Sequence, residues 1–212
     1  MIDVIHEINA VQRQVGRRTF EAGEARTVTV IRTYNAVVED VWDACTNPER
    51  IARWFLPVSG ELREGGRYQL TGNASGTVQR CAAPNSFAAT WEFGGDVSWI
   101  ELRLAPVGNG RTRLELEHTA HVNDERWVQY GPGAVGVGWD LALMGLTGHV
   151  ESAKTVDPSE AEAWSASDEG RQFITLSSQA WGEASIAAGT EPGMARAAAD
   201  RTTAFYTGTP VA

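Results

Sequence analysis

GPGAVGVGWDLALMGLTGHV, residues 131–150, is the stretch in which two fold classes can be told apart. Gly131, Gly133 and Gly136 have the G-x-G-x-x-G spacing of a dinucleotide-binding loop, which requires a strand directly before the first glycine inside a parallel βαβ unit. Here the preceding residues, VNDERWVQY, are polar and irregular, and the earlier strands are joined by hairpin signals. The pattern therefore argues against nucleotide binding.

The same residues predict a long helix. At 100° per residue, one side carries the bulky apolar residues Trp139, Leu143, Leu146 and Val150, and the next carries Gly138, Ala142, Gly145 and Gly148. Only Asp140, Thr147 and Glu151 form a narrow polar strip. A helix that is apolar over most of its circumference must be packed on more than one side, and its glycines allow close approach of a sheet or leave room for a ligand.

The residues before this helix predict an antiparallel sheet. Residues 27–34 alternate and are rich in β-branched side chains, and short helices are expected at 38–45 and 48–55, the second capped by Asn47. Further strands are expected at RYQL (67–70), SGTVQRCA (75–82), SFAATWEF (86–93), SWIELRLAP (98–106) and RTRLELEHTA (111–120). Asn109-Gly110 is a strong hairpin signal. Alternation along these strands gives the sheet one apolar face, which the long helix must cover.

Helical segments are expected at both ends of the chain. Val4, Ile8, Val11 and Val15 follow helical spacing, and two Ala-rich helices are predicted at about 170–188 and 190–206. We therefore expect an N-terminal helical extension (1–26), a central domain (27–150) and a C-terminal helical extension (151–212). The apolar sides of the last two helices are mostly alanine, with anchors such as Phe173, Trp181, Met194 and Phe205. Such faces predict close packing, either on the domain or across a homodimer.

Composition excludes several classes of function. The formal net charge of −9, without a local cluster of Lys and Arg, disfavours nucleic acid and anionic membranes as partners. The chain contains neither an apolar run long enough to span a membrane nor the pattern of a secretory signal, so a cytoplasmic protein is expected. Cys45 and Cys81 have no metal-ligand spacing and are expected to be small core residues. His6 and His121 have no ligand spacing with the other histidines, so neither a metal nor a cofactor is predicted.

The order of strand, two short helices, antiparallel strands and long helix resembles the helix-grip fold of the START-like (SRPBCC) superfamily, an α+β fold. Within it, the chain is most similar to the family named after the activator of heat-shock protein 90 ATPase. The resemblance covers residues 27–150 and rests on Val41-Trp42, Asn47-Pro48-Glu49-Arg50, Arg53-Trp54-Phe55, Gly65-Gly66-Arg67-Tyr68, Thr90-Trp91-Glu92, Leu116-Glu117-His118-Thr119 and Gly138-Trp139. It implies a curved sheet around its long helix, with an apolar cavity between them. It implies no single activity, because the superfamily includes lipid carriers, hormone receptors and polyketide aromatase/cyclases.

This resemblance suggests a set of ligand-binding residues: Trp54, Phe55, Tyr68, Phe87, Trp91, His118 and Trp139. The alternative for each aromatic residue is ordinary core packing, and for His118 it is a core histidine bonded to its neighbours. His149 either faces the same cavity or packs under the C-terminal extension, and we favour the latter. Asp140 and Glu92 suit a solvated face, so no acid/base pair is predicted.

Three functions are consistent with these observations. The leading hypothesis is binding of a small hydrophobic or aromatic molecule without chemical change, for which the many tryptophans and the glycine-rich helix argue. The second is an enzyme of the polyketide cyclase/aromatase or hydrolase type that uses His118. The third is a co-chaperone-like module that binds another protein.

Overall fold

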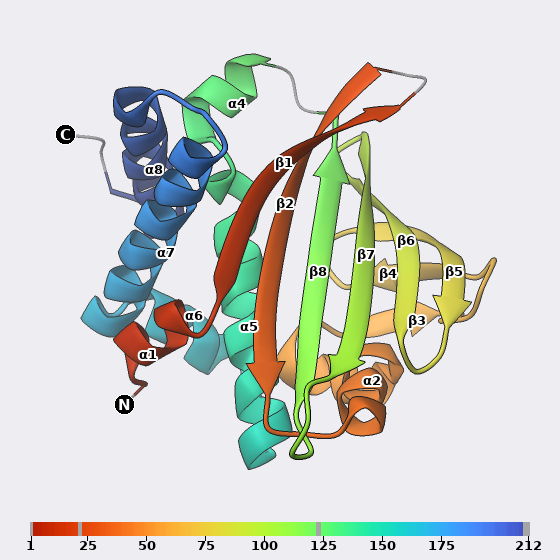
Figure 1. Cartoon of the computed structure of the whole chain (residues 1–212). Coiled ribbons are helices and arrows are strands. Elements are labelled where there is room, and N and C mark those ends of the chain that lie inside the picture. Colours follow the sequence, from red (N-terminus) through yellow and green to blue (C-terminus); the bar gives the residue numbers. More distant parts are fainter. Residues whose placement is uncertain (1, 21–22, 122–123, 210–212) are drawn as a thin grey trace. The chain divides into compact units, whose positions relative to one another are not determined.

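The computed structural model describes residues 2–20, 23–121 and 124–209. Their strands form one eight-stranded sheet with the order β1-β2-β8-β7-β6-β5-β4-β3, and the pairings from β3 to β8 are antiparallel. Figure 1 shows this sheet together with the long helix α5. The fold is α+β and has the helix-grip arrangement, as the sequence predicted.

The strands are β1 (Gln12–Phe20), β2 (Gly23–Tyr34), β3 (Val58–Gly60), β4 (Arg67–Leu70), β5 (Ser75–Ala82), β6 (Ser86–Phe93), β7 (Asp96–Pro106) and β8 (Thr112–Ala120). The helices are α1 (Val4–Asn9), α2 (Val38–Thr46), α3 (Pro48–Trp54), α4 (Asp124–Tyr130), α5 (Gly133–Ser152), α6 (Pro158–Ala166), α7 (Asp168–Ala187) and α8 (Pro192–Thr207). The chain divides into two compact units: a sheet unit (31–120 and 142–156) and a helical unit (1–30, 121–141 and 157–212).

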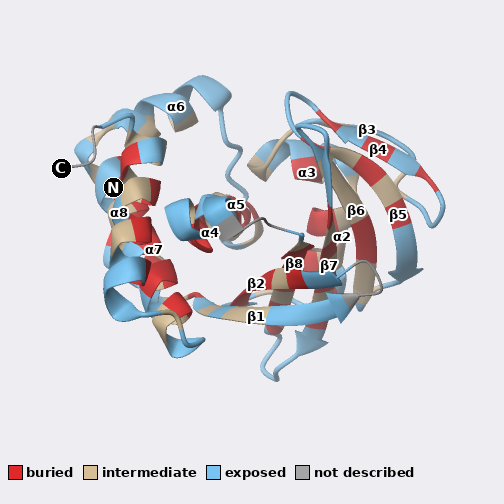
Figure 2. Cartoon of the chain, turned by 90° about the horizontal axis from the view of Figure 1, so that it is seen from above, coloured by how far each residue is buried: buried red, intermediate tan, exposed pale blue. Residues whose placement is uncertain are grey.

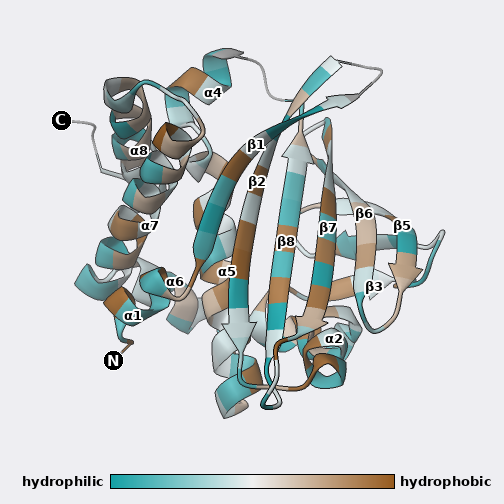
Figure 3. Ribbon diagram, in the orientation of Figure 1, coloured by the Kyte–Doolittle hydropathy of each residue, from teal (hydrophilic) through white to brown (hydrophobic). Residues whose placement is uncertain are grey.

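The strands of the sheet unit have one apolar and one charged face. Along β7 and β8, buried residues alternate with more exposed ones, which Figure 2 shows as bands and Figure 3 shows as alternating hydropathy. The outer face carries alternating charges: Arg103 binds both Glu101 and Glu115, and Arg113 binds Glu115 as well. Water can solvate this outer face, so the opposite, apolar face is the one that packs against other elements.

The C-terminal half of α5 packs closely on the sheet unit. The Tyr34 hydroxyl, fully buried at the end of β2, donates a hydrogen bond to the Leu143 carbonyl (3.3 Å). A Cβ at Gly145 would lie 2.5 Å from the carbonyl oxygen of Trp54, so only glycine allows this approach to α3. Close backbone approach is therefore one reason for the glycines of this helix, as expected.

The glycines of the G-x-G-x-x-G motif have a packing role within the helical unit. A Cβ at Gly136 would lie 2.1 Å from the indole of Trp181, and one at Gly133 would lie 3.0 Å from Thr202. Trp181, from α7, is completely buried. The motif thus lets α5 approach α7 and α8, which agrees with its rejection as a nucleotide-binding loop.

The alanines of α7 and α8 also pack within the helical unit. A Cβ at Gly182 on α7 would lie 3.3 Å from the Ala199 side chain, and Ala195, Ala198 and Ala199 are buried. The two helices lie side by side in Figures 1 and 3. Of the predicted apolar anchors, Met194 and Phe205 are exposed, whereas these alanines are buried by packing within the same chain.

Four local predictions were wrong. The N-terminal helix ends at Asn9, and residues 12–20 form β1. Val11 and Val15 are four residues apart, a spacing that fits the period of a strand as well as that of a helix. The segment interpreted as irregular contains α4, and the polar stretch after α5 contains α6, capped by Asp157. Cys81 is exposed and not a core residue, whereas Cys45 is buried as expected and burial raises the pKa of its thiol to about 12.

No helix in the described ranges is both long and apolar enough to cross a membrane.

Candidate functional site

The strand register places four of the predicted ligand-binding residues on the apolar face of the sheet unit. Trp91 on β6 pairs with Ser98 on β7, and Ile100, two residues further along β7, pairs with His118 on β8. Phe87 pairs with Leu102 on the same face. Tyr68 on β4 pairs with Gly76, which the β5–β6 register places opposite Trp91. These residues come from three strands, β4, β6 and β8, and lie on one face because directly paired residues share a face.

Tyr68 is held flat against the sheet. A Cβ at Gly76 would lie 2.8 Å from Cε1 of the Tyr68 ring, so the missing side chain at Gly76 makes room for the ring. The Tyr68 hydroxyl donates to the Thr90 carbonyl at 2.6 Å. Burial raises the pKa of this hydroxyl, and the charge of Glu92 adds to the effect. The Tyr68 hydroxyl therefore stays protonated near neutral pH, and its ring contributes an uncharged aromatic surface to this face.

His118 forms a buried polar chain with Ser98 and the backbone. Its Nε2 lies 2.8 Å from Oγ of Ser98, and that hydroxyl donates to the Trp91 carbonyl at 3.0 Å. Because the serine proton points to the carbonyl, Nε2 must carry the proton that Ser98 accepts. Burial lowers the pKa of His118 to about 4, so the ring is neutral at physiological pH. The sequence did not indicate Ser98 as a site residue, because alternation gives the face of a residue but not its hydrogen-bond partner.

The aromatic rings on or beside this face are partly exposed. Trp91, Phe87 and Trp42 are half-buried, and the Trp42 and Phe87 rings meet edge to face at 6.2 Å. The rings of Trp91 and His118 lie 6.0 Å apart. By contrast, the aliphatic residues Ile100, Leu102 and Leu116 of the same face are buried. Large aromatic surface thus stays accessible on the face that alternation assigns to the interior.

Trp54 and Phe55 form a second aromatic pair in the sheet unit. They end α3 and stack with their ring centroids 5.6 Å apart, and both are half-buried. The Trp54 indole N–H donates to the Ala44 carbonyl of α2 at 2.9 Å. This hydrogen bond fixes the orientation of the indole and leaves its ring faces for apolar contacts.

Trp139 belongs to the helical unit, where it is buried. Its neighbour Asp140 corrects a prediction, because it is 1% exposed instead of solvated. Oδ2 of Asp140 accepts hydrogen bonds from Arg13 Nε (2.9 Å) and Trp181 Nε1 (3.1 Å) and a short one from Ser177 Oγ. Asp140, the first residue of the polar strip of α5, therefore faces β1 and α7 within this unit.

Two further polar predictions concern the sheet unit. Glu92 does lie on the charged face, where its carboxylate binds Arg67 at 2.9 Å, and this contact lowers the pKa of Glu92. His149 is buried, and its Nδ1 lies 3.2 Å from the carbonyl oxygen of Lys154, near the start of the C-terminal extension. Its Nε2 lies 3.1 Å from Nε of Arg50 on α3. The sequence alone did not indicate this partner, because Arg50 and His149 are far apart along the chain.

Within the described ranges, no group of three His, Cys, Asp or Glu side chains is arranged to hold a metal ion.

Comparison with known proteins identifies the family. Residues 35–151 match the family described as activator of Hsp90 ATPase homolog 1-like protein. The crystal structure of CalU16 from Micromonospora echinospora is 35% identical, with a TM-score of 0.66, over 85% of this chain and 99% of that one. The solution NMR structure of CalU16 gives 37% identity and a TM-score of 0.68 over 84% and 95% of the two chains.

A third structure supports the fold alone. DynU16, described as a protein of the dynemicin biosynthetic locus, is 22% identical with a TM-score of 0.55 over 61% of this chain and 48% of that one. No curated protein matches the chain. The similarity to CalU16 extends well beyond residues 35–151, so part of the flanking segments is shared with it. The chain belongs to the family of activator of Hsp90 ATPase homolog 1-like proteins.

Proposed function

We propose that the protein binds a small hydrophobic or aromatic molecule on the apolar face of its sheet unit. The observation that carries this proposal is the set of half-buried aromatic rings, Phe87 and Trp91 on the face itself and Trp54 and Phe55 on α3. Half-buried rings of this size keep apolar surface in contact with water, and a ligand that covers this surface gains the free energy of removing it from water.

The polar groups of this face favour an apolar ligand. The hydroxyls of Tyr68 and Ser98 both donate to backbone carbonyls, of Thr90 and Trp91. A ligand that competed for these protons would leave a buried carbonyl unpaired, at a cost of about 1–3 kcal/mol. Recognition would therefore come from stacking and shape, and burial of about 200 Å² of apolar ligand surface supplies roughly 5 kcal/mol before the costs of association.

Native mass spectrometry of the purified protein tests this proposal directly. We expect a small molecule to remain bound, or a planar aromatic probe to bind with micromolar affinity and to quench tryptophan fluorescence. Trp91→Ala should weaken the binding by about tenfold or more, the loss expected when a stacking partner is removed. Trp127→Phe is the matched control, because Trp127 is a half-buried tryptophan of the helical unit. Equal loss in both variants, or no binding at all, would contradict the proposal.

Trp139 is also a proposed ligand contact. Its contribution is tested separately with Trp139→Phe, which keeps an aromatic ring at a buried position. A loss of probe affinity without a loss of thermal stability would support this role.

The hydrogen bond between His118 and Ser98 is the one observation that favours an enzyme. At 2.8 Å, the pair has the spacing of a base and a nucleophilic hydroxyl. However, a histidine whose pKa is about 4 is a weak base at neutral pH, and the serine proton is directed to the Trp91 carbonyl. Hydrolysis of a panel of aryl esters that disappears in both Ser98→Ala and His118→Ala would establish the enzymatic alternative in place of simple binding.

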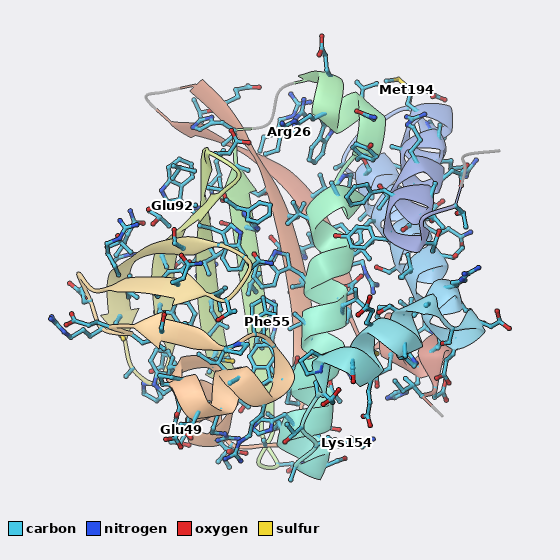
Figure 4. All side chains as sticks on the ribbon, turned by 180° about the vertical axis from the view of Figure 1, so that it is seen from behind. Arg26, Glu49, Phe55, Glu92, Lys154 and Met194 are labelled. Atoms are coloured by element: carbon cyan, nitrogen blue, oxygen red, sulfur yellow. The ribbon has the colours of Figure 1, made fainter. Side chains whose placement is uncertain are left out.

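A homodimer and a protein partner are further proposals. The surface left for a homodimer is the exposed apolar part of α8, including Phe205, which is 67% exposed, and Met194 at the N-terminal end of the helix (Figure 4). Light scattering of the wild type and of Phe205→Ser distinguishes a dimer through this surface from a monomer.

The family's description also suggests an Hsp90-type chaperone as a partner, and stimulation of chaperone ATPase activity tests it.

A further inference from the structure

The hairpin that joins β7 to β8 has Asn109 at its tip, between two glycines. Asn109 has a φ of +53° and Gly110 has a φ of +67°, so both residues adopt the left-handed backbone of a tight hairpin turn. The Arg111 N–H closes this turn by donating to the Gly108 carbonyl at 3.0 Å. The turn that the sequence predicted at Asn109-Gly110 is therefore present in the sheet unit.

Asn109 and Gly110 carry two groups that can react with each other: the side-chain carboxamide and the backbone nitrogen of the next residue. All residues from 105 to 111 are exposed. In the part of the chain that the structure describes, neither the Asn109 carboxamide nor the Gly110 N–H has a hydrogen-bond partner. A Cβ at Gly110 would meet no atom within 4 Å, so no neighbouring element crowds the turn. Both groups are solvated and can meet when the turn fluctuates.

The glycine makes this pair reactive. A backbone nitrogen that follows an asparagine can attack Cγ of its side chain and close a five-membered imide, and a side chain on the following residue hinders that approach. Gly110 has no side chain and the freest backbone of any residue type. None of the other asparagines of the chain precedes a glycine. Asn47 precedes Pro48, whose nitrogen has no hydrogen to lose.

Asn73 provides an internal comparison within the sheet unit. Its Oδ1 accepts a hydrogen bond from the Ala74 N–H at 2.8 Å, so its carboxamide already lies beside the following nitrogen. However, Ala74 has a Cβ and is completely buried, and the hydrogen bond keeps the proton on its nitrogen. Asn73 therefore has the proximity that the reaction needs but lacks the freedom of Asn109.

We propose that Asn109 is a site of spontaneous covalent modification, at which the side-chain amide is lost through a succinimide. The Gly110 nitrogen bonds to Cγ of Asn109, the Cγ–Nδ2 bond breaks, and the proton from Gly110 leaves with Nδ2 as ammonia. Water then opens one of the two C–N bonds of the imide. Opening at Cγ gives aspartate, and opening at the backbone carbonyl carbon of residue 109 gives isoaspartate. Either product adds one negative charge to the formal net charge of −9.

The two products differ in their effect on the hairpin. Aspartate leaves the backbone unchanged, whereas isoaspartate adds one carbon atom to the backbone of the turn. Beyond the turn, Pro106 pairs with Thr112, which is completely buried and donates its hydroxyl proton to the Ala36 carbonyl at 2.7 Å. This anchored pair confines the change to the tip of the hairpin, so the modified chain keeps its fold.

Peptide mapping of the folded wild type, kept at 37 °C and pH 8.5 and sampled over time, tests this site. Trypsin cleaves after arginine and so places Asn73 in peptide 68–80 and Asn109 in peptide 104–111. We expect peptide 104–111 to lose its amide at least about tenfold faster, because only Asn109 precedes an unhindered nitrogen. Electron-transfer fragmentation should find both aspartate and isoaspartate at residue 109. The rate should rise with pH, because the attacking nitrogen must lose its proton.

Asn109→Gln is the matched variant. It keeps an amide at an exposed position, but its imide would need a six-membered ring, which closes far more slowly, so peptide 104–111 should stay unmodified. Equal rates in the two wild-type peptides would overturn the proposal, as would a folded chain that stays intact at residue 109 while the urea-unfolded chain reacts. Aspartate without isoaspartate would also overturn it, because direct hydrolysis of the amide gives aspartate alone. These wild-type measurements do not depend on the folding of the variant.

Discussion

Arg13 Nε lies 2.9 Å from Asp140 Oδ2, an ion pair that joins β1 to α5 within the helical unit. Both side chains are almost completely buried, and among the described residues neither the second oxygen of Asp140 nor the Nη2 of Arg13 has a hydrogen-bond partner. The desolvation of the carboxylate raises the pKa of Asp140, against the opposing charge of Arg13. Separating β1 from α5 would leave each of these buried charges without its partner, which is energetically very costly, so the ion pair favours this one arrangement of the two elements.

Asp140→Asn should destabilise the protein by about 3–5 kcal/mol, because it leaves the buried guanidinium of Arg13 without a counter-charge. Chemical denaturation followed by circular dichroism measures the change. The matched control is Glu61→Gln, which breaks the exposed pair with Arg63 and should cost under about 1 kcal/mol. The double variant Arg13→Met/Asp140→Leu should lose less free energy of unfolding than Asp140→Asn, because it leaves no unpaired charge. If the double variant lost as much as the two single variants added together, the two charges would not interact.

Two glycines of α5 should respond to alanine in opposite ways. At Gly136 the new Cβ would lie 2.1 Å from the Trp181 ring, so we expect a loss of about 2 kcal/mol or more from overpacking. At Gly148 the nearest atoms are flexible carbons of Lys154 at 3.6 Å or more, so alanine should gain up to about 1 kcal/mol of helix propensity. Thermal unfolding of the two variants side by side checks both signs. A neutral Gly136→Ala would refute the packing role of the motif.

Stability should depend on pH through His118. Its pKa in the folded state, about 4, lies below the ordinary value of about 6.5, so the unfolded chain binds the proton more readily. The contribution of the neutral ring to the free energy of unfolding is fully present above about pH 6.5. It decreases as the pH falls toward 4, by up to about 3 kcal/mol. Urea titrations of the wild type and His118→Gln from pH 7.5 to 4 isolate the effect. The gap between the two curves should narrow on acidification, and a constant gap would contradict the assignment.

The two cysteines should differ in reactivity. Cys81 is exposed, whereas Cys45 is buried and its thiol has a pKa of about 12, so almost no thiolate forms at pH 8. A thiol reagent such as DTNB should label one cysteine per chain in the native protein and two in denaturant. The variant Cys81→Ser should give no rapid native labelling, and rapid labelling of it would show that Cys45 is accessible.

Periodicity was sufficient to predict most elements and their faces. The alternation of Ile100, Leu102 and Leu104 with charged residues predicted the buried face of β7, because a strand with one packed face has a period of two. It could not separate helix from strand at Val11 and Val15, where both periods fit, so β1, the neighbour of β2 in the sheet, was predicted as a helix. Short polar helices such as α6 have no apolar stripe and were missed for that reason.

Local patterning, read from the chain itself, was enough for the antiparallel strands, the capped helix pair and the long glycine-rich helix, and together they indicated the helix-grip fold and its family. It could not assign partners to polar side chains. Asp140 seemed solvated and is an ion-paired core residue, His149 binds Arg50, and Ser98 completes the environment of His118. These pairings join residues 20 to 127 positions apart, and their energies depend on burial and on distances of about 3 Å that no periodicity encodes.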